Sequence, residues 1–267
     1  MRGLLNHYCD LELPEEVVFG LASGVASIYM AGPGIDPAHF LVGRGFSIEV
    51  DLADNLQVDY REQAEEGDEV AWQAVREEVF EGRPTMLSGD ILYLDYREYK
   101  VHFPGHRFVL LGFDDATEKV EIADRINVEP ELCSYGALRT SRNPPEGMST
   151  HNLWGKFHGT DVGRSLRDAA RVALDRCAAT RLAGAPVSPL DPASAMTIVS
   201  GVSATRRFAD SIPGWAERDD AGWIASYNSR CIEKFGNGGG NFRRLYAGFL
   251  DWAHALDPAL APASAGD

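Results

Sequence analysis

The sequence predicts an α+β fold in which an antiparallel sheet precedes a helical region. From Asp68 to Glu81, apolar residues recur at helical spacing, which predicts a helix packed on one side of a sheet. Short apolar runs bounded by turn residues then indicate strands near 84–88, 91–96, 106–113 and 119–123.

The second half of the chain is alanine-rich and has helical patterning. Pro144 and Pro145 mark this change in composition, and Asn241 stands where it would cap the last helix. The four expected helices cover 165–179, 192–210, 219–235 and 241–256. The domains that follow from this pattern are a sheet domain at 1–148, a helical domain at 149–256 and a disordered tail at 257–267.

The start of the chain is expected to be helical and then rich in turns. Residues 1–9 have the pattern of a helix, and Pro14 opens a second helix with acidic residues in its first turn. The glycine-rich stretch from Gly20 to Gly45 predicts turns and short strands that border a pocket. Its glycines do not form the GxGxxG pattern, so no dinucleotide site is predicted.

The composition argues against several classes of function. A formal net charge of −15 and a pI near 4.9 disfavour sequence-independent binding to nucleic acid or to anionic membranes. No apolar run is long enough for a membrane span, and the first residues lack the pattern of a signal peptide. The four cysteines have no CxxC spacing, so we expect the reduced thiols of a cytoplasmic protein.

His106 and Asp124 are the main candidates for catalysis. His106 opens the apolar run FVLLGF and Asp124 follows the next strand, so an antiparallel hairpin would bring the two side chains together. A carboxylate that accepts one imidazole N–H leaves the other ring nitrogen free to take a proton from a thiol, as in a papain-type pair. Residues of these types at strand ends are also common as surface neighbours, and the spacing alone leaves that interpretation open.

A metal site is not predicted. His102 and His106 form an HxxxH pattern, which on a helix would suggest zinc. The intervening Pro104 and Gly105 exclude a regular helix, so the two imidazoles would not share a helical face.

Several blocks in the same order resemble the butirosin-biosynthesis acyltransferase family, which is related in fold to papain-like and bacteriocin-processing peptidases. The blocks are LLNHYCDLELPEEVVFGLASG at 4–24, GRPTMLSGDILYLDYR at 82–97, HFPGHRFVLLGFDD at 102–115, VEIADR at 120–125 and GGGNFRRLYAGFLDWA at 238–253. The resemblance implies a papain-like domain with an antiparallel sheet, followed by a helical domain.

The resemblance also implies a nucleophilic cysteine at the start of the first helix, and this chain has none there. Either the start codon has been assigned too late, or the protein has lost its nucleophile. The intact His106 and Asp124 blocks favour a late start. Cys9 lies at the helix exit, where a small buried or cap-adjacent cysteine is the expected interpretation.

Asp90 and Tyr93 are placed near the pocket by the same resemblance. Asp90 would bind a substrate ammonium or support the histidine, whereas an aspartate after glycine most often forms an Asx turn. Tyr93, Tyr96 and Tyr99 would line the same cleft or serve as strand aromatics.

Arg243 and Arg244 are candidates for binding a phosphopantetheine arm, because they follow a glycine-rich turn at a helix amino terminus. A capped helix after a flexible connection explains the same pattern.

The implied donor is an acyl carrier protein, and no bound cofactor is expected. The implied acceptor is a small amine or an aminoglycoside-like compound. The acidic run at 49–69 would attract such a cation or would form a solvated face.

The function implied by the resemblance is acyl transfer in specialised metabolism from a carrier thioester to an amine, through a Cys-His-Asp mechanism whose nucleophile is not among these residues. A cysteine peptidase or amidase uses the same chemistry with water as acceptor. A non-catalytic binding or scaffold protein is the alternative if the cysteine has been lost.

Overall fold

The computed structural model describes residues 1–33, 35–103, 105–124, 129–146, 149–184, 196–234 and 238–261. The chain forms two compact units, each discontinuous in sequence. Unit 1 comprises residues 1, 3–10 and 59–161, and unit 2 comprises residues 2, 11–58 and 162–267. Residues 11–58 therefore belong to the same compact unit as the C-terminal part of the chain. The domain boundary expected after residue 148 stays a prediction.

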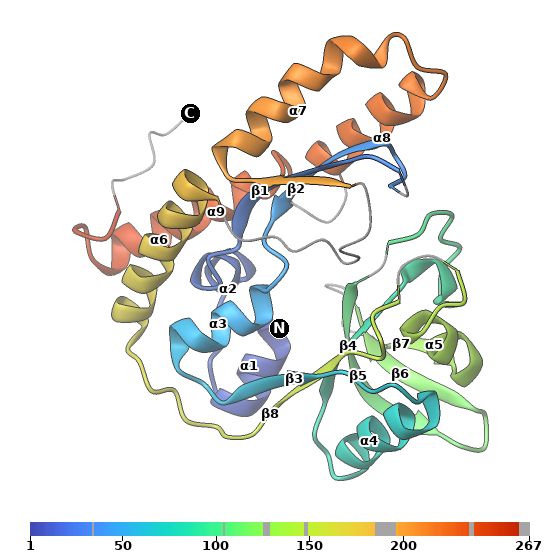
Figure 1. Cartoon of the computed structure of the whole chain (residues 1–267). Helices are drawn as coiled ribbons and strands as arrows, with labels where there is room; N and C mark the ends of the chain where they lie inside the picture. Colours follow the sequence, from blue (N-terminus) through green and yellow to red (C-terminus); the bar gives the residue numbers. More distant parts are fainter. Residues whose placement is uncertain are drawn as a thin grey trace. The chain divides into compact units, whose positions relative to one another are not determined.

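Unit 1 contains, among the described residues, a six-stranded antiparallel sheet with the order β3-β8-β4-β5-β6-β7 (Figure 1). Its strands are β3 (Tyr60–Gln63), β4 (Thr85–Gly89), β5 (His106–Asp114), β6 (Lys119–Ala123), β7 (Glu131–Ser134) and β8 (Trp154–Phe157). The accompanying helices are α1 (Arg2–Cys9), α4 (Asp68–Phe80) and α5 (Tyr135–Arg142), with the 3-10 helix η1 (Ile91–Tyr93).

The core of unit 1 lies between this sheet and the helices α4 and α5. In β6, Val120 and Ile122 are fully buried, whereas Lys119 and Glu121 are exposed. This two-residue alternation fixes which face of the strand meets the core. The other core residues include Val75 and Val79 of α4, Leu138 of α5, and Leu87, Phe108 and Leu110 of the central strands.

The structure confirms the helix expected from Asp68 and three of the four strands expected in this unit. The strand expected at 91–96 is wrong. Residues 91–93 form η1 instead, because the Asp90 side chain accepts a hydrogen bond from the Leu92 backbone N–H at 3.1 Å. A carboxylate that bonds to the backbone two residues ahead favours a turn over an extended strand.

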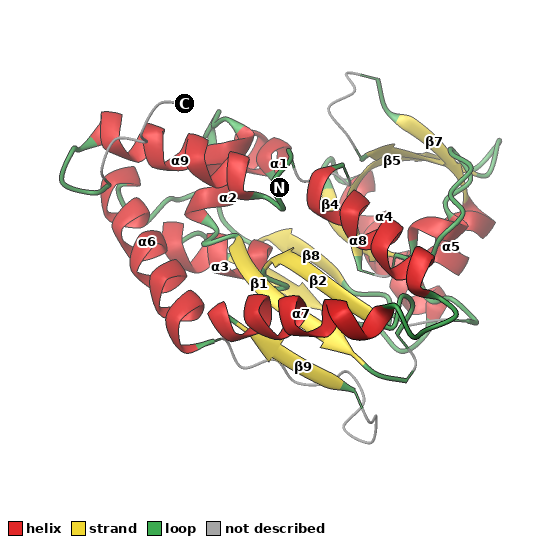
Figure 2. Cartoon of the chain, turned by 90° about the horizontal axis from the view of Figure 1, so that it is seen from above, coloured by secondary structure: helices red, strands yellow, loops and turns green. Residues whose placement is uncertain are grey.

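Unit 2 combines a three-stranded antiparallel sheet, of order β2-β1-β9, with helices. The strands are β1 (Val25–Ala31), β2 (His39–Arg44) and β9 (Thr197–Ser200). The helices are α2 (Glu15–Leu21), α3 (Ile48–Leu56), α6 (Leu166–Ala183), α7 (Val202–Trp215), α8 (Ala221–Glu233) and α9 (Arg243–Leu256). Helix α7 packs along the sheet at β1 and β9, as Figure 2 shows.

Three expectations for unit 2 need correction. The helix expected at 192–210 begins only at Val202, because residues 197–200 pair with β1 as strand β9; residues 192–195 lie outside the described part. Asn241 does not cap the last helix, since Phe242 holds that position without a side-chain cap. In the tail expected to be disordered, residues 257–261 are described and Asp257 bonds to Arg167, whereas 262–267 lie outside the described residues.

Helix α2 packs against helix α9 through Gly20. A Cβ atom added at Gly20 would lie 1.8 Å from Cγ of Phe249, whose side chain is fully buried. Glycine is therefore required here by close approach rather than by backbone conformation.

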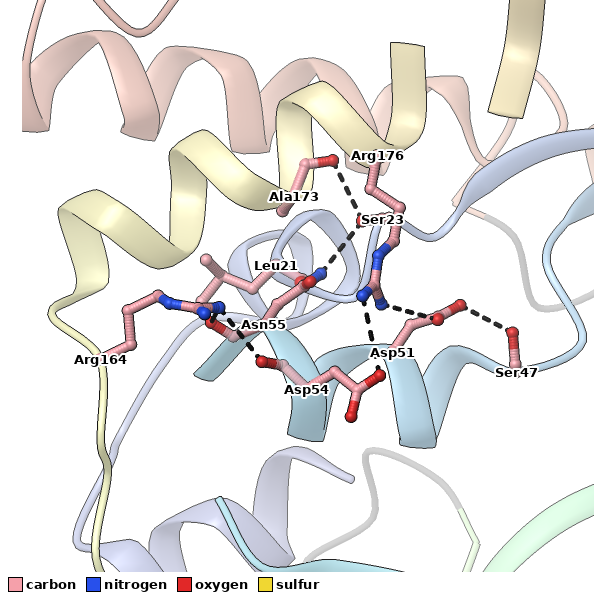
Figure 3. Close-up of polar contacts among 9 residues, drawn as sticks. All are labelled: Leu21, Ser23, Ser47, Asp51, Asp54, Asn55, Arg164, Ala173 and Arg176. Carbon is pink, nitrogen blue, oxygen red and sulfur yellow. Dashed lines mark hydrogen bonds and ion pairs between the residues drawn. The ribbon is translucent and has the colours of Figure 1, made fainter. Parts of the chain in front are cut away.

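A polar cluster joins α2, α3 and α6 within unit 2 (Figure 3). Asn55 is fully buried, and its amide donates to the Leu21 carbonyl at 2.7 Å and to the Ser23 hydroxyl at 3.1 Å. Arg176 of α6 pairs with Asp51 of α3 at 2.8 Å. Part of the acidic run at 49–69 therefore holds helices together and is not simply a solvated face.

No helix within the described ranges is both long and apolar enough to cross a membrane.

The glycine-rich stretch does border a hollow in unit 2, as its sequence predicted. Ala31, Gly32 and Pro33 are among the residues that line this cavity of about 610 Å³.

Candidate active site

His106 and Asp124 meet at one end of the six-stranded sheet. Because Val109 pairs with Ala123, the next residue, Asp124, lies opposite Phe108. His106 is two residues from Phe108 in the same strand, so its side chain points to the same face of the sheet. His106 Nε2 lies 2.5 Å from Asp124 Oδ1. The predicted contact is present, while the catalytic role of the two residues stays a prediction.

Tyr96 completes a three-residue hydrogen-bond chain. Its hydroxyl donates to Asp124 Oδ2 at 2.7 Å, so each carboxylate oxygen has a side-chain partner. The Asp124 side chain is only 1% exposed. Burial, and then the neighbouring charge of Asp124, raise the pKa of Tyr96 well above its usual range, so this hydroxyl remains a donor.

The imidazole of His106 is held from one side only. Asp124 binds Nε2, and among the described residues Nδ1 has no hydrogen-bond partner. The side chain is 22% exposed, and the rings of Phe103 and Phe108 lie beside it with centroids 6.4 Å and 6.1 Å away. This geometry suits a proton acceptor, because the carboxylate fixes the ring and leaves Nδ1 accessible.

Asp90 is not placed to bind a substrate ammonium directly. Its side chain is fully buried, Oδ1 accepts from the backbone N–H groups of Leu92 and Phe103, and Oδ2 contacts His102 Nδ1 at 2.7 Å. The expected Asx turn is confirmed. The alternative that Asp90 supports a histidine also fits, although that histidine is His102 rather than His106.

Tyr93 lies at the end of η1 and not in a strand. Its ring centroid is 6.0 Å from that of His102, which places it beside the Asp90–His102 pair. Neither this second pair nor the bond from Tyr96 to Asp124 was predicted from the sequence. The HxxxH pattern at His102 and His106, which on a helix would suggest a metal site, was the available signal for the second pair.

The four cysteines of the chain do not complete a catalytic triad with His106. None of the described contacts joins a cysteine to this imidazole. Burial raises the pKa of the Cys133 and Cys231 thiols to about 12. Burial also raises the pKa of Cys177 and of Cys9, the last residue of α1. Raised pKa values leave little thiolate at neutral pH, so these thiols are poor nucleophiles.

Arg243 and Arg244 lie in unit 2, at the start of α9. One guanidinium nitrogen of Arg243 donates to the backbone carbonyls of Gly240 and Asn241 at 3.3 Å. Burial lowers the pKa of Arg243. Arg243 thus stabilises the turn that precedes α9. The phosphate-binding role of the two arginines stays a prediction.

No group of three potential metal ligands is found within the described residues. A cavity of about 290 Å³ in unit 1 is lined by residues of α4 and α5, including Trp72, Tyr135 and Arg142. Neither His106 nor Asp124 lines it. The candidate site is therefore defined by its hydrogen-bond geometry.

Two family matches cover most of the chain. Residues 1–125 match the family described as butirosin biosynthesis protein H, N-terminal, and this range contains His106 and Asp124. Residues 137–265 match a domain of unknown function, DUF4872. No curated protein matches the chain. The chain therefore combines a region that matches the N-terminal domain of butirosin biosynthesis protein H with a DUF4872 domain.

Proposed function

We propose that this protein serves acyl transfer in specialised metabolism, with His106 as the proton acceptor and Asp124 as the residue that orients it. The observation that carries the proposal is the 2.5 Å contact between His106 Nε2 and a buried carboxylate, together with an Nδ1 that has no partner among the described residues. The family match supports the biosynthetic setting.

The chemistry has two steps. His106 Nδ1 takes the proton of a thiol, and the resulting thiolate attacks the carbonyl carbon of an acyl thioester. The donor thiol leaves with the proton that His106 had taken, and an acyl-enzyme remains. A neutral amine then attacks the acyl-enzyme, an amide forms, and the protein thiol is released.

The proposed donor is an acyl carrier protein whose phosphopantetheine arm carries the acyl group, and the proposed acceptor is a small amine of the aminoglycoside type. Arg243 and Arg244 remain the candidates for the phosphate of that arm, because a guanidinium group binds phosphate through two parallel hydrogen bonds. The net charge of −15 favours a cationic acceptor.

The test compares the 267-residue chain with a chain extended through any in-frame codons that precede Met1 in its gene. Each is incubated with a panel of acyl thioesters, and intact mass is measured. We expect an acyl adduct on the chain that contains a thiol able to reach His106, and we expect His106→Ala to suppress it. An adduct that forms equally well in His106→Ala would contradict the proposal.

The four existing cysteines serve as internal controls. An adduct that maps to Cys9 would show that this thiol reaches the imidazole in spite of its raised pKa. Release of the adduct by water as fast as by amines would indicate a hydrolase of the peptidase or amidase type.

A non-catalytic binding protein is the second candidate. The observation that favours it is the raised pKa of all four thiols, none of which contacts His106 in the described part of the chain. No adduct with any thioester in either chain, combined with measurable thioester binding by calorimetry, would support this candidate over acyl transfer.

A further inference from the structure

A second histidine and carboxylate pair lies beside the first. The Cα atom of Gly89 in β4 is paired with that of His106 in β5, and Asp90 directly follows Gly89. Asp90 Oδ1 accepts the N–H of Phe103, whose ring lies next to His106. The Asp90–His102 pair and the His106–Asp124 pair therefore share one end of the sheet.

The two imidazoles are held through different nitrogens. Asp124 contacts Nε2 of His106, whereas Asp90 contacts Nδ1 of His102. Both carboxylates are almost fully buried, at 0% and 1% exposure, but the His102 side chain is 44% exposed. A buried anion that binds Nδ1–H leaves the lone pair of Nε2 available to solvent.

We propose that His102, oriented by Asp90, accepts the proton of the ammonium group that becomes the acyl acceptor. This proposal rests on the proposed function. A primary amine is protonated at neutral pH and has no lone pair with which to attack an acyl-enzyme. One ammonium N–H bond breaks, the proton passes to His102 Nε2, and the nitrogen keeps the electron pair that forms the amide bond. Asp90 stabilises the resulting imidazolium ion.

Other ionisable groups near His102 are compatible with this role. The Tyr93 ring lies beside the imidazole, and burial raises the pKa of Tyr93, with Glu146 and Asp90 adding to the effect through their charges. Tyr93 therefore stays neutral, and the carboxylates around it favour an approaching cation.

The informative variant is His102→Asn. The amide nitrogen of asparagine is as many bonds from the backbone as Nδ1, so it retains the donor to Asp90 while Nε2 is removed. His151→Asn is the matched control, because His151 is an exposed histidine of the same unit whose φ of 51° suits asparagine. Thermal unfolding should show that both variants fold.

The first experiment measures the amine-dependent release of a preformed acyl-enzyme from pH 6 to 10. For His102→Asn we expect release about a hundredfold slower at pH 7, a rate that recovers as the amine loses its proton in solution, and no such change in His151→Asn. A purely structural role would slow release equally at every pH. Equal pH profiles for His102→Asn and the unaltered protein would overturn the proposal.

The second experiment does not need acyl transfer, so it separates this proposal from the proposed function. Histidine labelled with ¹⁵N is followed by NMR while the aminoglycoside neamine is added to the 267-residue chain. We expect His102 to be protonated at Nδ1, and its Nε2 signal to shift with neamine in the unaltered protein but not in Asp90→Ala. A His102 signal that is indifferent to neamine, or a ring protonated only at Nε2, would refute the proposal whether or not the protein forms an acyl-enzyme.

Discussion

Buried polar side chains are used differently in the two units. At the sheet end of unit 1, Asp90 and Asp124 each hold an imidazole that still has one ring nitrogen without a partner among the described residues. In the polar cluster of unit 2, the amide nitrogen of Asn55 and the guanidinium group of Arg176 donate to groups of neighbouring segments (Figure 3), while the buried Asn55 Oδ1 has no partner among the described residues. Polar groups that satisfy one another stabilise a fold, whereas a group held from one side remains able to react.

Removal of individual polar groups should change the stability of the protein by different amounts. Asn55→Ala is expected to have the largest effect, because it leaves the Leu21 carbonyl and the Ser23 hydroxyl without their donor and creates a buried cavity. The free energy of unfolding in urea should fall by about 3 kcal/mol. Ser47→Ala, which removes an exposed hydroxyl bonded to Asp51 at the edge of the same cluster, is the control and should change it little. An equal loss of unfolding free energy in the two variants would contradict the expected difference between buried and exposed polar groups of the cluster.

Tyr96→Phe is expected to come next. It deletes the hydroxyl that donates to Asp124, a bond to a buried charge worth about 2 kcal/mol. Tyr93→Phe is the matched control, because the Tyr93 hydroxyl has no hydrogen bond in the described part of the chain. Urea unfolding of both variants measures the difference. If Tyr96→Phe is as stable as Tyr93→Phe, Asp124 does not depend on this donor.

Asp68 provides a third carboxylate, which is held by neighbouring side chains of unit 1. The amides of Asn152 and Asn143, and then Arg139, hold the pKa of Asp68 below its usual value of 3.8. A carboxyl whose folded pKa is depressed stabilises the protein above its unfolded pKa, and this contribution is lost as the pH falls through the folded value. Asp68→Asn should therefore lower the free energy of unfolding by about 1 kcal/mol at pH 6. The difference from the unaltered protein should shrink as the pH falls below 3.8. A constant difference across this range would argue against the depressed pKa.

Arg176→Ala should have the smallest effect. Its partners Asp51 and Asp54 are partly exposed, and salt bridges in contact with water contribute about 0.5 kcal/mol. The loss should also decline as salt is added, because ions screen exposed charges. Urea unfolding at low and high salt would show this. A large loss that salt does not change would mean that Arg176 acts as a buried member of the cluster.

The sequence predicted those features that depend on local pattern. The hairpin register follows from alternating residues in β6, and the His106–Asp124 contact follows from that register. The bond from Tyr96 to Asp124 and the contact between His102 and Asp90 join residues 28 and 12 positions apart, through a segment without regular pattern. The β-branched run Thr197–Val199 was assigned to a helix because its pairing with β1 is set by tertiary contacts. The division into two discontinuous units likewise depends on such long-range contacts.

The role of His106 is tested most directly by its tautomer, which can be measured on the 267-residue chain by ¹⁵N NMR. Loss of one signal in His106→Gln assigns the resonance among the seven histidines. We expect the tautomer in which Nε2 carries the proton bonded to Asp124 and Nδ1 carries none, and we expect Asp124→Ala to remove this preference. A ring protonated at Nδ1, or a tautomer unchanged in Asp124→Ala, would contradict the role of His106 as a proton acceptor oriented by Asp124.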